Sequence, residues 1–321
     1  MFRAVDAGAA ASVGVMARPL DSTGHPLGLV SVHAHPDDEA SKGAGTVAKY
    51  AAEGIRTALV CCTGGEEGEI LNPAADTPEV RADLQAVREA ELRASADAIG
   101  YARVYLLGYR DSGMPDTEAN ARLDNFANAP LDEAVGRLVD VIRRERPQVL
   151  VTYGDESAFY RHPDHLRVHE ISGPAFDAAG DPDRYPEAGE PWQPVKLYYS
   201  GFSFRRIRAL HDAYEALGEE SPYAERMARW PTDVQITPPT TFVDVGDFLA
   251  ARRAALLAHR TQIDPESHWM RVPDELMRST FPWEEYVLAR SLVPENEEPE
   301  TDLFAGVRAP TDVAREAEVR G

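Results

Sequence analysis

Cysteine, lysine and long apolar runs are the scarce features of this sequence of 321 residues. Its two cysteines, Cys61 and Cys62, are adjacent, which excludes the spaced disulfide framework of a small secreted protein. No apolar run reaches the length of about 18 residues that a membrane-spanning helix needs, so we expect none. Lysine supplies only three of the 33 basic residues, and each lysine is informative about its site because lysine and arginine are not interchangeable.

Positive charge is also in deficit, with 33 basic against 54 acidic side chains and a formal net charge of -21. A chain of that sign repels nucleic acids and anionic membranes, and we expect neither as a partner. Hydrophobic residues make up 43% of the chain and charged residues 27%, which is typical of a globular protein with a large core. We expect a cytoplasmic protein, and the sequence is compatible with a homo-oligomer.

An alternation of apolar runs and helical patterns organises the first half of the chain. We expect a flexible N-terminal extension at 1–24, where small residues dominate, and then four strand–helix units. The strands are expected at 27–32, 56–62, 104–107 and 148–153, and the helices at 42–53, 80–99, 131–146 and 165–176. Strands that alternate with helices in this way predict an α/β fold with a mostly parallel, doubly wound sheet and helices on both faces.

The second half of the chain has a weaker pattern. Strands are expected at 195–199 and 241–245, helices at 205–217 and 247–259, and an exposed acidic segment at 294–302. We therefore divide the chain into a catalytic domain at 25–185 and a C-terminal α+β cap at 186–321 that shapes substrate specificity.

Five of the nine histidines fall in two short segments, at 33–39 and 160–169. The first follows the first expected strand and the second follows the fourth. In the common strand order 3-2-1-4 these two strands are neighbours, and ligands bind beyond their carboxyl ends. We therefore expect the two segments to face each other, although Asp38 and His165 are far apart in the sequence.

Two neutral imidazoles and a carboxylate make a good site for a divalent transition metal, above all zinc. Three protein ligands leave a position for water, which is the catalytic arrangement, and a second carboxylate can take the water's proton. Asp37 and Asp38 can divide these two roles. The alternative is that these residues only cap helices and line turns, but two such segments at one switch point favour the metal site.

The same residues carry a resemblance to a known family. His-Pro-Asp-Asp at 35–38 and His-Pro-Asp-His at 162–165 resemble the motifs of the LmbE-like (PIG-L) zinc-dependent N-deacetylases. The loops at 63–69 and 110–114, which follow the second and third strands, fit the same family. The resemblance implies a Rossmann-like fold and the hydrolysis of an N-acyl group on a glucosamine that carries inositol, lipid or malate.

The resemblance also implies roles for individual residues. One zinc ion per chain is bound by His35, Asp38 and His165, and Fe²⁺ accepts the same ligands and stays an alternative. Asp37 is the general base for the attacking water. His162, helped by Tyr160, holds the oxyanion, and Asp164 orients His162. A proton reaches the leaving amine from Asp37 or His162.

Segments outside the metal motifs favour one branch of the family, the amidases that cleave mycothiol S-conjugates. The supporting segments are at 41–44, 68–73, 189–192, 196–199, 261–265, 282–286 and 302–307. In that branch Lys42 is expected to point into the pocket, where the related deacetylases have a small polar residue. Arg88 and Asp111 are expected to bind sugar and inositol hydroxyls, with Glu69 near the inositol.

The substrate would be a small thiol–sugar conjugate, and the products a mercapturic acid and glucosaminyl-inositol. One alternative is the N-acetylglucosaminyl-inositol deacetylase of mycothiol biosynthesis. Another is a specialised amidase that trims a mycothiol adduct in natural-product biosynthesis, because the segment at 154–159 has less glycine than the detoxification enzymes would show. A two-metal phosphoesterase and a non-catalytic sugar-binding protein are the remaining classes, and the single ligand set and the intact Asp37 argue against them.

Overall fold

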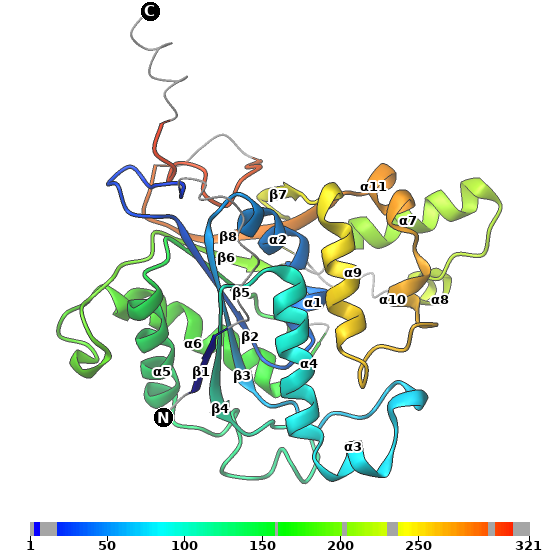
Figure 1. Ribbon diagram of the computed structural model, residues 1–321, viewed down its shortest axis with the longest axis horizontal. Coiled ribbons are helices and arrows are strands. Elements are labelled where there is room, and N and C mark those ends of the chain that lie inside the picture. Colours follow the sequence, from blue (N-terminus) through cyan, green and yellow to red (C-terminus); the bar gives the residue numbers. More distant parts are fainter. Residues whose placement is uncertain are drawn as a thin grey trace, which may run out of the picture.

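The computed structural model describes residues 3–6, 18–157, 160–200, 204–229, 237–294 and 299–310. In this part of the chain, eight strands form one sheet in the order β1-β4-β3-β2-β5-β6-β8-β7 (Figure 1). The strands are β1 (Arg3–Asp6), β2 (Gly28–His33), β3 (Arg56–Thr63), β4 (Arg103–Tyr109), β5 (Val149–Tyr153), β6 (Lys196–Ser200), β7 (Thr241–Asp244) and β8 (Trp283–Ser291). Strands β4, β3, β2, β5 and β6 run parallel, and the other three are antiparallel to their neighbours.

The parallel strands form the centre of the sheet because both of their faces are apolar. Strand β2 is buried at all six positions and β5 at all five, as expected of parallel strands covered on both sides. The first and fourth expected strands, β2 and β5, are neighbours, with Leu29 opposite Val149. This arrangement confirms the predicted α/β class and the 3-2-1-4 order on which the expected site depends.

Helices cover the two faces of the sheet in separate layers (Figure 1). On one face α2 (Ala44–Ala52), α4 (Leu84–Ile99) and α9 (Leu249–Ala258) share an apolar core with one set of strand side chains. On the other face α5 (Leu131–Glu145) and α6 (Pro163–Ala179) pack on the alternate set. Because successive strand residues point to opposite faces, the same strands supply both cores.

Two expected helices differ from their predicted bounds. The helix expected at 42–53 begins at Ala44 as α2, because Gly43 adopts a left-handed backbone with φ of 92° that separates it from a short helix, α1 (Asp38–Ser41), which was not predicted. The helix expected at 80–99 divides into α3 (Pro78–Ala82) and α4 at Asp83, whose side chain accepts the backbone N–H of Ala86 at 3.2 Å. The first break leaves Lys42 extended between two helices, so its side chain turns toward the strand ends.

The sheet continues across the expected boundary between residues 185 and 186. Strand β6 pairs in parallel with β5, and β8 and β7 then extend the same sheet in antiparallel pairs. The C-terminal α+β region therefore completes the catalytic sheet rather than forming a sheet of its own. The further helices of this region are α7 (Phe204–Leu217), α8 (Ala224–Ala228), α10 (His268–Arg271) and α11 (Asp274–Thr280).

Strand β8 was not predicted, because Glu284 and Glu285 interrupt the apolar alternation of the segment. Glu284 is nevertheless buried, since its carboxylate accepts the backbone N–H groups of Gly45 and Thr46 at 3.1 and 2.8 Å. These are free donors at the N-terminus of α2, where a carboxylate is a favourable partner. The C-terminal region thus fixes the helix that follows Lys42.

The N-terminal residues 3–6 correct part of another expectation. They were placed in a flexible extension, yet they pair antiparallel with β4 from Arg3 opposite Leu106 to Asp6 opposite Arg103. The edge of β4 offers unpaired backbone groups that a short strand can satisfy. The rest of the expected extension, at 1–2 and 7–17, lies outside the described residues. Among the described residues, no helix is long and apolar enough to cross a membrane.

Candidate active site

Four loops leave the carboxyl ends of β2, β3, β4 and β5 at one edge of the sheet. They begin after His33, Thr63, Tyr109 and Tyr153. Because the strands are parallel and adjacent, the loops converge on one place, as ligand-binding loops do in open α/β sheets. The two histidine-containing segments therefore meet here, as the sequence predicted.

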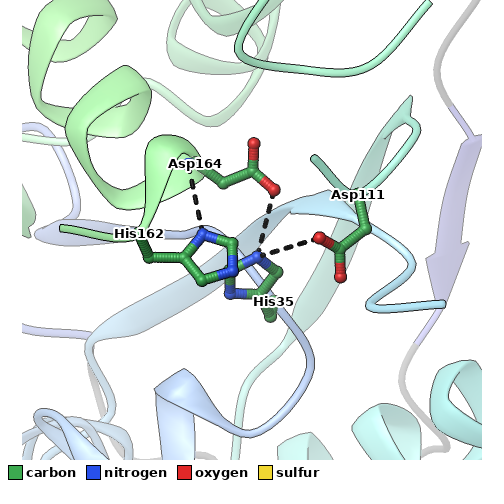
Figure 2. A group of neighbouring side chains, drawn as sticks. All are labelled: His35, Asp111, His162 and Asp164. Carbon is green, nitrogen blue, oxygen red and sulfur yellow. Dashed lines mark hydrogen bonds and ion pairs between the residues drawn. The ribbon is translucent and has the colours of Figure 1, made fainter. Parts of the chain in front are cut away.

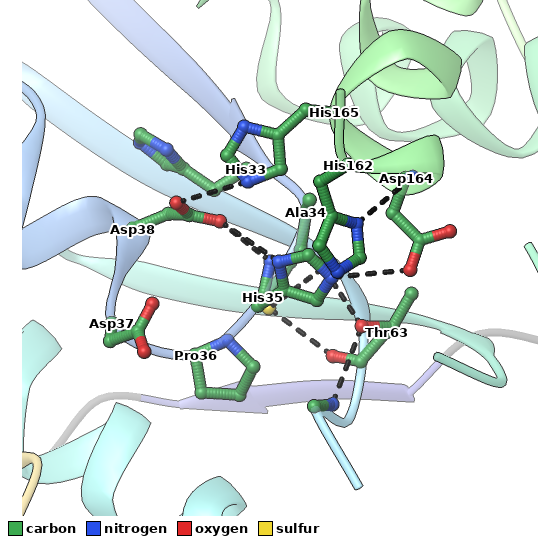
Figure 3. A network of polar contacts seen from close by, with 12 residues as sticks. His33, Ala34, His35, Pro36, Asp37, Asp38, Thr63, His162, Asp164 and His165 are labelled. Atoms are coloured by element: carbon green, nitrogen blue, oxygen red, sulfur yellow. Dashed lines mark hydrogen bonds and ion pairs between the residues drawn. The ribbon is translucent and has the colours of Figure 1, made fainter. Parts of the chain in front are cut away.

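The structure brings together the three expected metal ligands His35, Asp38 and His165 (Figure 3). Nδ1 of His35 lies 3.4 Å from Oδ2 of Asp38, and Nε2 of His165 lies 3.4 Å from Oδ1. All three side chains are buried. The backbone N–H of His35 also donates to Asp38 Oδ2 at 2.9 Å, which fixes this carboxylate against the loop.

These separations fit a zinc ion. Tetrahedral zinc with ligands at 2.0–2.1 Å keeps neighbouring ligand atoms about 3.3 Å apart. The electrostatics agree with the geometry. Burial lowers the pKa of His35, but contacts with Asp164, Asp38 and Asp111 outweigh burial and raise it well above its ordinary value. That excess of negative charge would be balanced by a divalent cation held by the three ligands.

A second acid–histidine group shares His35 (Figure 2). Nε2 of His35 lies 3.1 Å from Oδ2 of Asp164 and 3.8 Å from Oδ1 of Asp111. Asp164 is fully buried and also accepts the backbone N–H and the hydroxyl of Ser112. With its Nε2–H donated to Asp164, the His35 ring presents the Nδ1 lone pair to the metal position. This group therefore supports the first one, and we assign one metal position.

The arrangement corrects the expected partner of Asp164. Its side chain was predicted to orient His162, but its carboxylate contacts His35 and Ser112. The backbone N–H of Asp164 makes the contact with His162, donating to Nδ1 at 3.3 Å. His162 is the residue that precedes α6, and the first N–H groups of a helix need such an acceptor.

That contact fixes the tautomer of His162. Burial lowers its pKa to about 3, reinforced by the nearby His35, so the ring is neutral. Because Nδ1 accepts a hydrogen bond, the proton sits on Nε2. Nε2–H is therefore available as a donor beside the His35 ring, whose centroid is 4.4 Å away. Tyr160 lies nearby, with its ring 4.8 Å from that of His165, and it is partly exposed.

Asp37, the expected base, has an unusual backbone. Its φ of 113° lies in the left-handed region, which is strained for a residue with a side chain. Two neighbours hold it there. Its backbone N–H donates to Oε2 of Glu39 at 3.0 Å, and its carboxylate accepts from Arg88 at 3.0 Å. Burial raises the pKa of Asp37 against the opposing charge of Arg88, which suits a group that accepts a proton.

The contacts of Arg88 give it a role that was not predicted. It was predicted to bind substrate hydroxyls, yet it is only 3% exposed. Its guanidinium donates to the backbone carbonyls of Gly65 and Pro36 as well as to Asp37. The geometry makes Arg88 a support for the base, and contact with sugar stays a prediction.

Glu39 and His259 form a fully buried ion pair that the sequence did not single out. Nε2 of His259 lies 2.5 Å from Oε1 of Glu39, and Ser95 donates to the same carboxylate. His259 follows the last residue of α9, in the C-terminal region. It is 220 positions away from Glu39, and a lone histidine at that distance does not indicate a pair in the sequence. The pair connects the C-terminal region to the backbone of the base.

Lys42 lies inside the site, as expected. Its Nζ is 3.6 Å from Oδ1 of Asp38, 3.2 Å from Nδ1 of His165 and 4.1 Å from the centre of the Tyr153 ring. The ring of Tyr153 also stacks on that of His165 at 4.6 Å. Glu156 completes this cluster, and neither it nor Tyr153 was selected from the sequence.

The two remaining substrate candidates differ in exposure. Asp111 is buried beside His35 and accepts the N–H of Gly113 at 2.8 Å, and its contact with a sugar hydroxyl stays a prediction. Glu69 is exposed on the loop after β3. That loop is held by Thr261, whose carbonyl accepts the N–H of Leu71 at 2.8 Å, so the two segments that favoured the amidase branch, 68–73 and 261–265, lie against each other.

Comparison with known proteins finds relatives of this chain. The PIG-L family, described as GlcNAc-PI de-N-acetylase, matches residues 30–176. The chain is 46% identical to a mycothiol S-conjugate amidase of Streptomyces coelicolor over 88% of this chain and 98% of that protein. It is 40% identical to a 1D-myo-inositol 2-acetamido-2-deoxy-alpha-D-glucopyranoside deacetylase of Streptomyces avermitilis, over 87% and 97%. The fold matches the N,N'-diacetylchitobiose deacetylase of Pyrococcus horikoshii, with a TM-score of 0.57, 18% identity and coverage of 82% and 84%.

Proposed function

This chain belongs to the PIG-L family and is an amide hydrolase, and we propose that its substrates are mycothiol S-conjugates. Water would cleave the amide between glucosamine and the S-conjugated N-acetylcysteine, giving glucosaminyl-inositol and a mercapturic acid. The observation that carries the choice of substrate is Lys42, which lies among the metal ligands with its Nζ 3.6 Å from Asp38. The higher identity to the amidase than to the deacetylase supports the same choice.

The residues of the metal position are His35, Asp38 and His165. A zinc ion held there would act as a Lewis acid, polarising the amide carbonyl and lowering the pKa of a water molecule to about 7. Asp37 accepts the proton of the attacking water. Arg88 holds its carboxylate and Glu39 holds its backbone N–H, so little reorganisation is needed when the proton moves.

The oxyanion that forms on the amide carbonyl needs hydrogen-bond donors in fixed positions. His162 supplies Nε2–H, because its Nδ1 is committed to the N-terminus of α6. Tyr160 supplies a hydroxyl from the outer side of the site. A neutral His162 acts as a donor rather than as a general acid, so we assign the proton of the leaving amine to Asp37, which received it from water.

Lys42 would bind the acyl part of the substrate. Its ammonium group lies between Asp38 and Glu156, which follow β2 and β5. An S-conjugated N-acetylcysteine has two amide carbonyls and a substituent that can accept hydrogen bonds, whereas an acetyl group has only one carbonyl. A cation there therefore favours the larger acyl group.

The second candidate function is deacetylation of N-acetylglucosaminyl-inositol, which is favoured by the several relatives that carry that name at 37–40% identity. A comparison of kcat/KM for the two substrates, with zinc-loaded protein, separates the two functions. The proposal expects a mycothiol S-conjugate to be preferred by at least about tenfold. A preference for N-acetylglucosaminyl-inositol would assign the deacetylase, and turnover of neither would point to a specialised adduct.

A further inference from the structure

Glu156 is a buried carboxylate at the edge of the active site. It lies in the loop after β5, three positions beyond Tyr153, and is 4% exposed. Its two oxygens face two different nitrogen-bearing side chains of the site. Oε2 lies 2.8 Å from Nδ1 of His165, and Oε1 lies 3.7 Å from Nζ of Lys42. A buried carboxylate needs such partners, so Glu156 is tied to both.

The contacts of His165 set up a competition at one atom. Nδ1 faces Oε2 of Glu156 at 2.8 Å and Nζ of Lys42 at 3.2 Å. A carboxylate only accepts hydrogen bonds and an ammonium group only donates them, so a neutral imidazole satisfies one of the two at Nδ1. If Nδ1 carries the proton, it donates to Glu156. If Nδ1 is bare, it accepts from Lys42.

Only the first of these states suits a metal ligand. With the proton on Nδ1, the lone pair of Nε2 is free, and that atom faces Asp38 across 3.4 Å, where the metal position lies. With Lys42 donating to Nδ1, the proton of the neutral ring would sit on Nε2 and block that position. Glu156 therefore favours the tautomer that binds metal, as carboxylates paired with metal-binding histidines generally do.

Lys42 has other partners once Glu156 occupies Nδ1. Oδ1 of Asp38 lies 3.6 Å from Nζ, Oε1 of Glu156 lies 3.7 Å away, and the Tyr153 ring centre is 4.1 Å away. A cation over an aromatic ring and between two carboxylates is held well. The single carboxylate of Glu156 thus places Lys42 beside His165 without letting it take the ring nitrogen.

We propose that Glu156 is a positioning residue that orients His165 for metal binding through one oxygen and holds Lys42 toward the substrate through the other. The second half rests on the proposed function, because it gives Lys42 a substrate to bind. The first half does not, since it concerns metal affinity alone. Glu156 thereby couples metal binding to the choice of acyl group.

The test uses the full chain and measures zinc affinity by competition with a chelator, which needs no substrate. Glu156→Ala should weaken zinc binding by about 10- to 100-fold. Lys42→Ala should leave zinc binding unchanged or strengthen it, because it removes the competing donor at Nδ1. Asp155→Asn is the matched control, since Asp155 is exposed in the same loop and its carboxylate accepts the backbone N–H of Ser157 at 2.9 Å. Its zinc affinity should stay within about twofold of that of the wild type.

The kinetic arm uses a saturating zinc concentration, so that lost metal affinity does not hide the effect on Lys42. Glu156→Ala and Lys42→Ala should each raise KM for a mycothiol S-conjugate, and the double variant should raise it little more than Lys42→Ala alone. A circular dichroism spectrum and a melting curve of each metal-free variant show that it is folded.

A zinc affinity of folded Glu156→Ala within about twofold of the wild type would overturn the first half. Independent, additive effects of the two substitutions on KM would overturn the second. Weak zinc binding by Glu156→Ala in a protein that cleaves no S-conjugate would support the orientation of His165 while the proposed function fails. Normal cleavage of the S-conjugate by the wild type, together with an unchanged zinc affinity in Glu156→Ala, would support the proposed function and overturn the orientation of His165 by Glu156.

Discussion

Nη2 of Arg88 lies 3.0 Å from Oδ2 of Asp37, and the guanidinium is almost completely buried. Nη1 donates to the carbonyl of Gly65 and Nη2 also donates to that of Pro36, and these two carbonyls lie in the loops after β3 and β2. Arg88 therefore ties two loops of the site to the carboxylate of the base. Asp37 keeps a left-handed backbone because these contacts and that of Glu39 determine its position.

Replacing Arg88 with lysine tests this role. Lysine keeps the charge but cannot make the forked contacts of a guanidinium, so Asp37 should lose its fixed orientation. We expect Arg88→Lys to lower kcat by about 10- to 100-fold with a small change in KM, an effect typical of lost orientation. A large rise in KM with unchanged kcat would instead show that Arg88 binds sugar hydroxyls.

Lys42→Ala tests the choice of substrate. We expect kcat/KM for a mycothiol S-conjugate to fall about tenfold, a loss of about 1.4 kcal/mol in transition-state binding, and deacetylation of N-acetylglucosaminyl-inositol to change less. Lys49→Ala is the matched control, because Lys49 donates to the carbonyl of Asp244 away from the metal ligands. Equal losses on both substrates would contradict a role of Lys42 in specificity.

The buried pair of His259 and Glu39 makes stability depend on pH. Burial lowers the pKa of His259, but the charge of Glu39 outweighs burial and raises it above 6.5. The stabilisation is therefore complete below about pH 6.5 and is lost as the pH rises through the folded-state pKa. Burial raises the pKa of Glu39, but the charge of His259 outweighs burial and lowers it overall. The stabilisation that comes from Glu39 is therefore lost only in acid.

We accordingly expect His259→Gln to lower the free energy of unfolding by about 3–5 kcal/mol at pH 6 and by less at pH 9. Denaturant titrations of the metal-free protein at the two pH values measure this difference. His211→Gln serves as the control, since its contact with Glu215 at 3.6 Å lies on one helix and involves a largely exposed carboxylate. A loss that is the same at both pH values would exclude a charged pair.

Metal removal should abolish turnover and lower the melting temperature. A metal held by His35, Asp38 and His165 binds only the folded chain, so it stabilises by about 2.7 kcal/mol when its free concentration is 100 times its dissociation constant. One zinc per chain should restore activity, and Fe²⁺ added without oxygen shows whether the second metal also serves. Full turnover by protein that contains no transition metal would contradict the account.

The sequence was sufficient to predict the centre of the molecule. Apolar runs located strands β2 to β5, and the placement of histidine and aspartate directly after β2 and β5 predicted that His35 and His165 would meet. Local patterns determine both features, because a buried parallel strand is apolar throughout and the ends of adjacent parallel strands lie together.

The supports of the site could not be predicted in the same way. Glu39 and His259 are 220 positions apart, and Arg88 reaches carbonyls on two other loops, so their roles depend on tertiary contacts that leave no local pattern. Strand β8 was missed because a glutamate in the sequence indicates an exposed position. Glu284 is buried only because it accepts the free N–H groups at the N-terminus of α2, which no local pattern reveals. Each of these residues is polar and buried, which is unusual for its type.

The most direct test of the account is a comparison of the wild type with Asp37→Asn, both loaded with one zinc per chain. Asparagine keeps the size and the contact with Arg88 but cannot accept the proton of water. The account predicts release of mercapturic acid from a mycothiol S-conjugate by the wild type, and a kcat lower by about 10²- to 10⁴-fold in the variant with zinc retained. Release by Asp37→Asn at a rate close to that of the wild type would contradict it.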